Sequence, residues 1–179
     1  MKKLFSLIIL VTIITSCCNN KDTIIYNFTT DEKAFVPYEK QTVIKWEDNT
    51  GAVFNGIVSE KTSRMSEISD QDCKEIIGES SEIRFTIDDS IYTVSLNKWD
   101  NSRIDLIVSP NNTIQNNDIS FYKSFLNIND FGTVNFNGEV FENSIKINGN
   151  VPNNTLIYSK TNGIEFILFA DGTWYKRVE

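Results

Sequence analysis

Polar and apolar residues alternate along most of the chain from Ile24 onward, and this two-residue period constrains the fold more than any other feature. Successive side chains of a strand point to opposite faces, so strict alternation predicts strands with one buried face. The alternation is clearest over residues 81–87 and 91–96, which turn-forming residues 88–90 separate. We therefore predict an all-β fold, with one antiparallel domain of about 8–11 strands over residues 24–179. A curved sheet, a lipocalin-like barrel and a sandwich all fit this pattern.

Three dipeptides predict tight hairpins in the C-terminal half: Asn-Gly at 137–138, Asn-Gly at 162–163 and Asp-Gly at 171–172. A two-residue type I′ turn needs positive φ at both central positions, which Asn, Asp and Gly tolerate. Turns of this length also determine which residues face each other across the two strands. The predicted cross-strand pairs are Val134–Phe141, Leu156–Phe169, Phe169–Trp174 and Leu168–Tyr175.

The strand predicted over residues 164–169 is apolar on both faces, which a sheet with one wet face does not require. Either another part of the chain covers the second face, or that face binds a partner. Aromatic residues allow a similar choice, because they pack in cores or form platforms on which sugars and apolar ligands stack. The candidate ligand or partner surface comprises Trp46, Trp99, Phe166, Leu168, Trp174 and Tyr175.

One segment, near residues 69–77, is predicted to form a short helix. Ser69 offers a cap and is followed by two acidic residues within three positions, and Gly78 ends the segment. Acidic residues in a first turn complement the helix dipole. We expect this helix to cover an open end or a face of the sheet.

The sequence contains no histidine, which limits the chemistry that it supports. Ser-His-Asp triads, Cys-His dyads and HExxH zinc sites all need an imidazole. A net charge of −7 argues against sequence-independent binding to nucleic acid, because the surface would repel phosphate. Paired carboxylates remain as acid–base groups, and they make a glycoside hydrolase acting on envelope polysaccharide the enzymatic alternative. We expect neither a metal site nor a cofactor.

The first 17 residues combine the features of an export signal. Met1 is followed by two lysines, and residues 4–14 form an apolar stretch too short to span a bilayer as a helix. Its last residue begins the tetrapeptide Ile14-Thr15-Ser16-Cys17, which resembles the lipobox of bacterial lipoproteins. The resemblance implies a signal peptide over residues 1–16, cleavage before Cys17, and attachment of acyl chains such as palmitate to that cysteine.

The same resemblance implies a place in the cell envelope. The acyl chains would hold the protein in the outer membrane through a polar tether over residues 17–23. The sequence leaves open whether the domain faces the periplasm or the cell surface. It also leaves open whether Cys18 and Cys73 form a disulfide.

The C-terminal half carries a second resemblance. Residues 137–143 (Asn-Gly-Glu-Val-Phe-Glu-Asn) and 156–164 (Leu-Ile-Tyr-Ser-Lys-Thr-Asn-Gly-Ile) are similar to hairpins of small uncharacterised lipoproteins of Bacteroidota type. Phe141 and Ser144 depart from that pattern, in which tyrosine and valine are usual. The resemblance implies a curved antiparallel sheet and brings no activity with it. We expect a non-enzymatic binding or envelope-assembly module, with an apolar ligand, a glycan or an envelope protein as its partner.

Overall fold

The computed structural model describes residues 22–71, 74–110 and 120–178, and the fold of these residues is all-β, as predicted. Twelve strands form one open sheet, accompanied by one short α-helix, α2 (Thr30–Lys33), and a 3-10 turn, η1 (Ile128–Asp130). The strands are β1 (Asp22–Tyr26), β2 (Val43–Asp48), β3 (Val53–Gln71), β4 (Lys74–Ile87), β5 (Ser90–Lys98), β6 (Ile104–Pro110), β7 (Phe121–Lys123), β8 (Gly132–Phe136), β9 (Glu139–Asn148), β10 (Thr155–Ser159), β11 (Gly163–Leu168) and β12 (Trp174–Val178).

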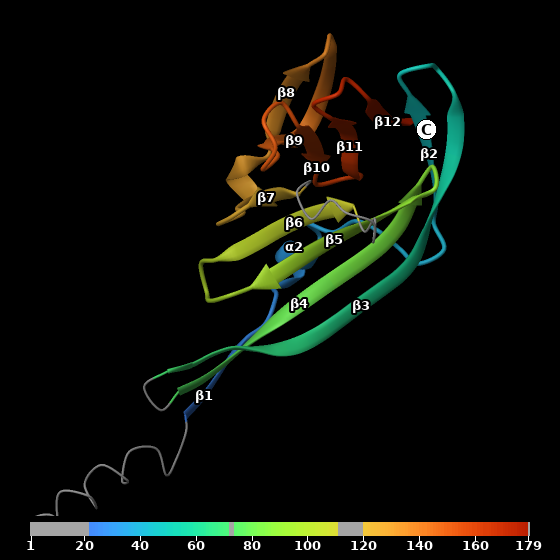
Figure 1. Cartoon of the computed structure of the whole chain (residues 1–179). Helices are drawn as coiled ribbons and strands as arrows, with labels where there is room; N and C mark the ends of the chain where they lie inside the picture. Colours follow the sequence, from blue (N-terminus) through green and yellow to red (C-terminus); the bar gives the residue numbers. More distant parts are fainter. Residues whose placement is uncertain (1–21, 72–73, 111–119, 179) are drawn as a thin grey trace, which may run out of the picture.

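The sheet follows the order β7-β6-β5-β4-β3-β2-β12-β11-β10-β9-β8, and all neighbours along this path are antiparallel. Strand β1 lies off the path and pairs with β4 in parallel. The sheet curls so that β3–β7 and β8–β12 form two halves that face each other (Figure 1). A bridge between Phe121 and Gly149 joins the halves, yet the sheet is open and not closed into a barrel. Of the three predicted arrangements, the curved sheet is the one found.

The segment between β1 and β2, residues 27–42, fills the space between these halves, and we call it the core segment. Phe28, Phe35, Val36 and Tyr38 are each at most 6% exposed and belong to the main core. The Tyr38 ring stacks on Phe85 of β4, with ring centroids 5.5 Å apart. This segment is therefore part of the core, although its sequence contains no long apolar run.

Two buried tyrosine hydroxyls connect this segment to the other half of the sheet. The Tyr38 hydroxyl accepts a hydrogen bond from the backbone N–H of Ile164 at 2.7 Å, and the Tyr158 hydroxyl donates to the carbonyl of Phe35 at 2.7 Å. Burial raises the pKa of the Tyr158 hydroxyl well above its ordinary value, so it remains a donor at every physiological pH. Each bond satisfies a buried backbone group that would otherwise lack a partner.

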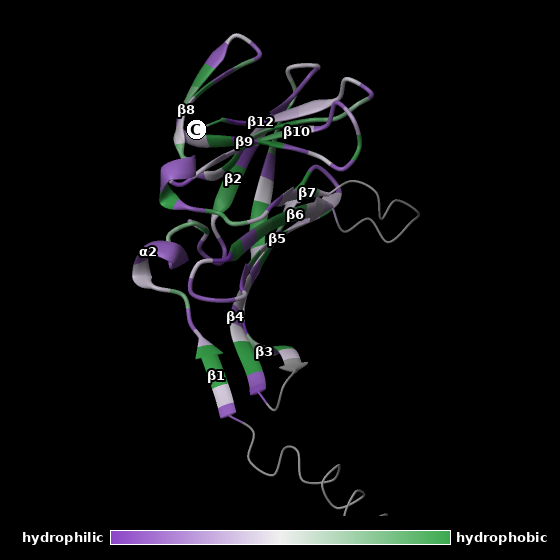
Figure 2. Ribbon diagram, turned by 90° about the vertical axis from the view of Figure 1, so that its left-hand side faces the viewer, coloured by the Kyte–Doolittle hydropathy of each residue, from purple (hydrophilic) through white to green (hydrophobic). Residues whose placement is uncertain are grey.

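Helix α2 belongs to the same segment and lies to one side of β4 and β5 (Figure 2). Thr29 and Glu32 form a capping box, in which each side chain accepts from the backbone N–H of the other residue. Glu32 also forms an ion pair with the buried Lys98 of β5, with 2.6 Å between Oε1 and Nζ. These bonds stabilise a helix that is too short to form by propensity alone.

The helix predicted near residues 69–77 is wrong. Residues up to Gln71 belong to β3, and β4 begins at Lys74; residues 72 and 73 lie outside the described part of the chain. In β4, Ile76 and Ile77 pair with Ile24 and Ile25 of β1. A two-turn helix is only marginally stable without strong packing. In the strand conformation these β-branched residues form backbone hydrogen bonds with β1 and β3 and pack against their side chains.

The hairpin at 137–138 has the predicted register, with Val134 opposite Phe141. The two later registers are wrong, because Leu156 lies opposite Ile167, and Leu168 lies opposite Trp174. At the first of these turns Ser159 pairs with Gly163, so the loop has three residues and a bulge follows it. Gly163 there has a φ of +78°, which is the left-handed conformation that such a loop needs.

Gly163 and Gly138 offer a matched test of how closely the core segment approaches the sheet. Both have positive φ, but a Cβ at Gly138 meets nothing within 4 Å, whereas one at Gly163 would overlap the Tyr38 ring. We expect Gly138→Ala to lower the free energy of unfolding by about 1 kcal/mol through its backbone conformation. Gly163→Ala adds a steric clash in a rigid core, so we expect a loss of about 3 kcal/mol or more. Urea denaturation of both variants measures the difference, and equal losses would contradict this packing.

Candidate functional site

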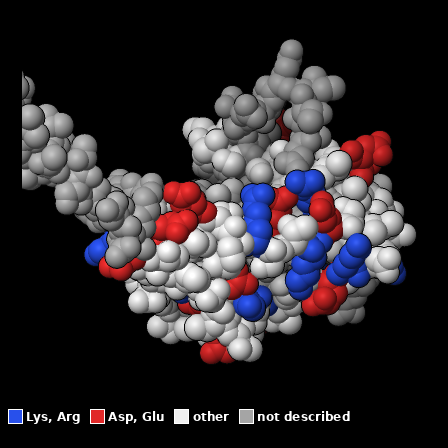
Figure 3. Space-filling view, turned by 90° about the horizontal axis from the view of Figure 1, so that it is seen from below, with Lys and Arg blue, Asp and Glu red and all other residues white. Residues whose placement is uncertain are grey.

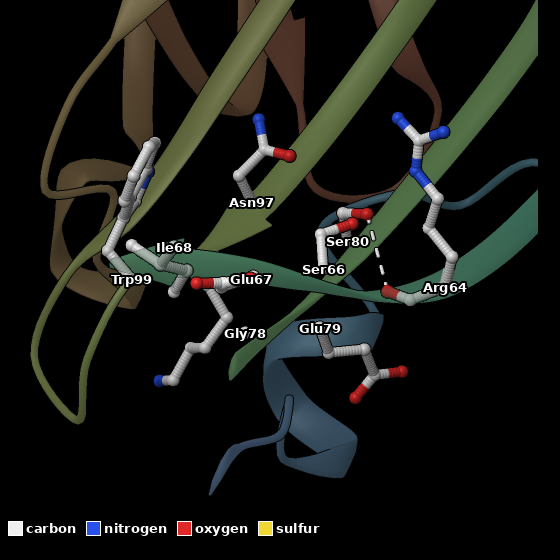
Figure 4. A pocket seen from close by; sticks show the side chains of 10 residues that line it. Arg64, Ser66, Glu67, Ile68, Gly78, Glu79, Ser80, Asn97 and Trp99 are labelled. Carbon is white, nitrogen blue, oxygen red and sulfur yellow. Dashed lines mark hydrogen bonds between the residues drawn. The ribbon is translucent and has the colours of Figure 1, made fainter. Parts of the chain in front are cut away.

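A groove lies on the hairpin of β3 and β4, at the place where β5 ends (Figure 4). Its volume is about 210 Å³, and its walls come from β3, from β4 and from the last residues of β5 with Trp99. Arg64, Asn97 and Trp99 rise on one side of the strands, while Glu79 points to the other side (Figure 4). Because Glu79 faces the core segment, we call the face with the groove the outer face.

Gly78 forms the floor of the groove. A Cβ at this position would overlap the carbonyl oxygen of Lys98 and the side chain of Ile68. Gly78 is also the residue of β4 beside which β1 ends, since its partner is Tyr26. The missing side chain therefore lets the end of β5 and the Ile68 side chain of β3 approach β4 closely, at the place where β1 replaces β5 as the neighbour of β4.

Trp99 forms one wall and is 37% exposed. The Arg103 guanidinium lies over its ring at 5.1 Å from the centroid, and over the Phe125 ring at 5.3 Å. A cation between two aromatic rings is attracted to both faces. The indole is thus held in place by Arg103 while part of its surface remains open to solvent.

Arg103 is itself fixed by Asp105, which is 1% exposed. Asp105 accepts hydrogen bonds from Arg103 at 2.9 Å, from the Tyr122 hydroxyl at 2.7 Å and from the Ser124 hydroxyl at 2.9 Å. Burial alone would raise the pKa of this carboxyl, but the bonds from Arg103, Tyr122 and Ser124 outweigh it and lower the pKa. Asp105 therefore stays ionised and orients the cation that holds Trp99.

The opposite wall carries Arg64, an exposed residue of β3. Its guanidinium forms no ion pair with any residue that the structure describes. Arg84, on the same face of the hairpin, forms ion pairs with Glu60 at 3.3 Å and with Glu82 at 2.7 Å. Arg64 is thus available to a ligand, whereas Arg84 is engaged.

The charged residues on the other face of the hairpin hold the core segment. Glu79 accepts from the backbone N–H of Phe28 at 2.8 Å, pairs with Lys33 at 3.2 Å and accepts from Ser63 at 3.1 Å. Burial would raise the pKa of Glu79, but these three bonds lower it. Lys98 is engaged in the same way by Glu32. Glu79 and Lys98 also border the groove, yet their charges are already neutralised.

A second, larger cleft of about 510 Å³ lies beside β2, β11 and β12. Its Glu165 accepts from the Ser159 hydroxyl at 2.6 Å and from the Asn162 amide at 2.9 Å, and its Arg177 donates to the Asn162 carbonyl. These charged groups bond to the protein itself, and the lining of the cleft includes no aromatic ring. The groove beside Trp99 is therefore the stronger candidate.

The structure separates the six residues of the predicted ligand surface. Trp46 is fully buried in the main core and stacks on Phe85. Tyr175 faces the inside of the sheet, where its ring meets Phe54 and Phe169 edge-on. Of the three tryptophans, Trp99 alone lines the groove. Cys17, the predicted lipidation site, lies outside the described residues.

The remaining three residues of that surface lie together on the outer face of β11 and β12. Phe166 is 1% exposed beneath Trp174, with ring centroids 5.4 Å apart, and Leu168 pairs with Trp174 across the strands. Phe136 and Phe141 of the β8–β9 hairpin meet the Phe166 ring at 5.6 and 6.3 Å. On the second apolar face of β11 the chain therefore covers Phe166, whereas Leu168 and Trp174 stay half-buried.

Sequence reasoning missed Arg64, Asn97 and Gly78. They meet only because β3 and β4 pair through a region predicted to be helical, and because β5 stops at Lys98. The single available signal was Gly78, which was interpreted as a helix stop.

The carboxyls of the described residues bear on the enzymatic alternative. Five of their carboxyls have clearly shifted pKa values, and all five shifts are downward: Glu32, Asp48, Glu79, Asp100 and Asp105. A glycosidase acid needs a raised pKa. Across residues 22–71, 74–110 and 120–178, no group of three His, Cys, Asp or Glu residues is arranged to hold a metal ion. No helix in this part of the chain is long and apolar enough to cross a membrane.

Comparison with models of known families, with curated proteins and with solved structures finds no match to this chain. The type of domain is therefore described from the structure of this chain alone. It is an open, curled, all-β domain whose long hairpin carries a groove with an aromatic wall.

Asp105→Asn tests the network behind Trp99. The folded-state pKa of Asp105 lies below the unfolded value of about 3.9, so its charge stabilises the fold above that pH and loses this effect as pH falls through the folded pKa. We expect the variant to be less stable by about 1–3 kcal/mol at pH 7. The difference from the unsubstituted protein should shrink below about pH 4. Urea denaturation at both pH values measures it, with the exposed Asp89→Asn as control; a difference independent of pH would contradict the network.

Proposed function

We propose that this chain is a lipoprotein of the bacterial cell envelope, held in the outer membrane by acyl chains on Cys17. Its β-domain would be a non-enzymatic binding module, with the groove beside Trp99 as the binding site. The observation that supports this most is the position of β1. This strand begins at Asp22, five residues after Cys17, and pairs with the N-terminal end of β4.

The length of the tether limits the distance between the proposed anchor and the groove. Asp22 pairs with Lys74, the first residue of β4. Five extended residues span at most about 18 Å, so a lipid on Cys17 would keep the end of the hairpin close to the bilayer. The groove floor at Gly78 lies four residues further along β4, or about 13 Å. A ligand in the groove would therefore lie within about 30 Å of the attachment point.

The surface charge supports a binding partner other than nucleic acid. Lys and Arg alternate with Asp and Glu on the face of the molecule shown in Figure 3, with uncharged residues between them. Several oppositely charged side chains of the described residues form ion pairs, such as Lys61 with Glu39 at 3.1 Å. A phosphate backbone needs a continuous basic surface, which this face does not offer.

Cys17→Ala tests the anchor. The variant cannot receive a thioether-linked diacylglyceryl group, so we expect the protein to move from the membrane fraction to the soluble fraction of a bacterial host. The neighbouring Cys18→Ala is the matched control and should remain in the membrane fraction with labelled palmitate incorporated. Membrane association of Cys17→Ala equal to that of the unsubstituted chain would rule out this anchor.

A further inference from the structure

We infer that the groove beside Trp99 binds a neutral glycan, with one sugar ring stacked on the exposed part of the indole. This inference rests on the proposed binding function and specifies its ligand. A sugar ring has one face of C–H groups and a rim of hydroxyls, so it needs an apolar plane beside groups that both donate and accept hydrogen bonds. The groove combines these two features.

The apolar plane is Trp99. Arg103 lies over the ring at 5.1 Å from its centroid, and Trp99, which is 37% exposed, lines the groove. A tryptophan fixed in this way loses little side-chain freedom when a ligand stacks on it, which favours binding. The network through Asp105 thus has a use beyond stability, because it prepares the ring before the ligand arrives.

The polar rim lies opposite. Asn97 offers an amide that donates and accepts, Ser66 offers a hydroxyl, and the unpaired guanidinium of Arg64 offers several donors. The Ser80 hydroxyl donates to the Arg64 carbonyl at 3.3 Å and can still accept. Asn97 and Arg64 project on the same side of the strands as Trp99 (Figure 4). Hydroxyl groups of a sugar match such a mixture, whereas a purely apolar ligand would leave these groups without partners.

Charge favours an uncharged sugar. Arg64 and Glu67 are the charged residues of the groove that are not engaged by the core segment, and their formal charges cancel. The chain as a whole carries a net charge of −7, which disfavours an acidic glycan at long range.

Size favours a single ring of a longer chain. The volume of about 210 Å³ is below the range of about 300–1,000 Å³ in which drug-sized ligands are enclosed. One sugar fits inside, and its neighbours would extend over the open hairpin. Such a site suits a linear polymer better than a small free metabolite.

The test is a titration of the detergent-solubilised full chain with two neutral probes, N-acetylglucosamine tetramer and maltotetraose, and one acidic probe of equal length, tetragalacturonate. We expect saturable binding of at least one neutral probe, little changed between low and high salt because no ionic contact carries it. Trp99→Ala should weaken this binding at least about tenfold, and Trp99→Phe by no more than about fivefold, since phenylalanine keeps an aromatic plane.

Two matched controls separate ligand contact from structural effects. Ile57→Ala removes an exposed apolar side chain of β3 that does not line the groove, so its binding should equal that of the unsubstituted protein. Arg64→Gln should weaken binding about threefold or more, while Arg84→Gln, on the same face and already paired, should not. Thermal unfolding of all variants identifies any that fail to fold.

Three results would overturn the inference: no saturable binding of either neutral probe, equal binding by Trp99→Ala, or binding confined to the acidic probe and lost at high salt. The last result would indicate an anion site at Arg64. These titrations do not depend on the anchor, so they can fail while Cys17→Ala still releases the chain from membranes, and the reverse also holds.

Discussion

A curled open sheet leaves a concave space that must be filled, and this chain fills it with the segment between β1 and β2. Tyr38 is the centre of that arrangement, because its ring stacks on Phe85 in one half of the sheet and its hydroxyl accepts from Ile164 in the other. Tyr158 returns a bond to the same segment through Phe35. Without this segment, two apolar surfaces would face water, and a buried N–H of β11 would lose its partner. The rest of the architecture depends on this contact.

The core segment also explains why the two faces of the β3–β4 hairpin differ. On the inner face, Glu79 and Lys98 are both engaged by residues around α2. Those contacts occupy the inner face, whereas on the outer face Arg64 has no ion-pair partner among the described residues and Trp99 stays accessible. The proposed binding groove thus lies on the face of the hairpin that the core segment does not contact, so the same packing determines both the fold and the position of the groove.

The features of the fold that the sequence predicts are those that depend on interactions between residues close together in the chain. Alternation and the turn at 137–138 predict the all-β class and one register, because both depend on neighbouring residues. The three-residue loop before Gly163 was not predictable from its dipeptide, since Tyr38, more than a hundred residues away, helps to define it. The segment at 69–77 failed for a similar reason, because a short window cannot reveal the pairing with β1. The groove joins three strands across such pairings, so only Trp99 was identified in advance.

The pairing of β1 links the proposed anchor to the proposed site. Two strands alone are marginally stable in water, and beyond the end of β5 the β3–β4 hairpin gains its third strand from β1. That third strand ends beside Gly78, which is also the floor of the groove. Strand β1 therefore stabilises the part of the hairpin that forms the groove.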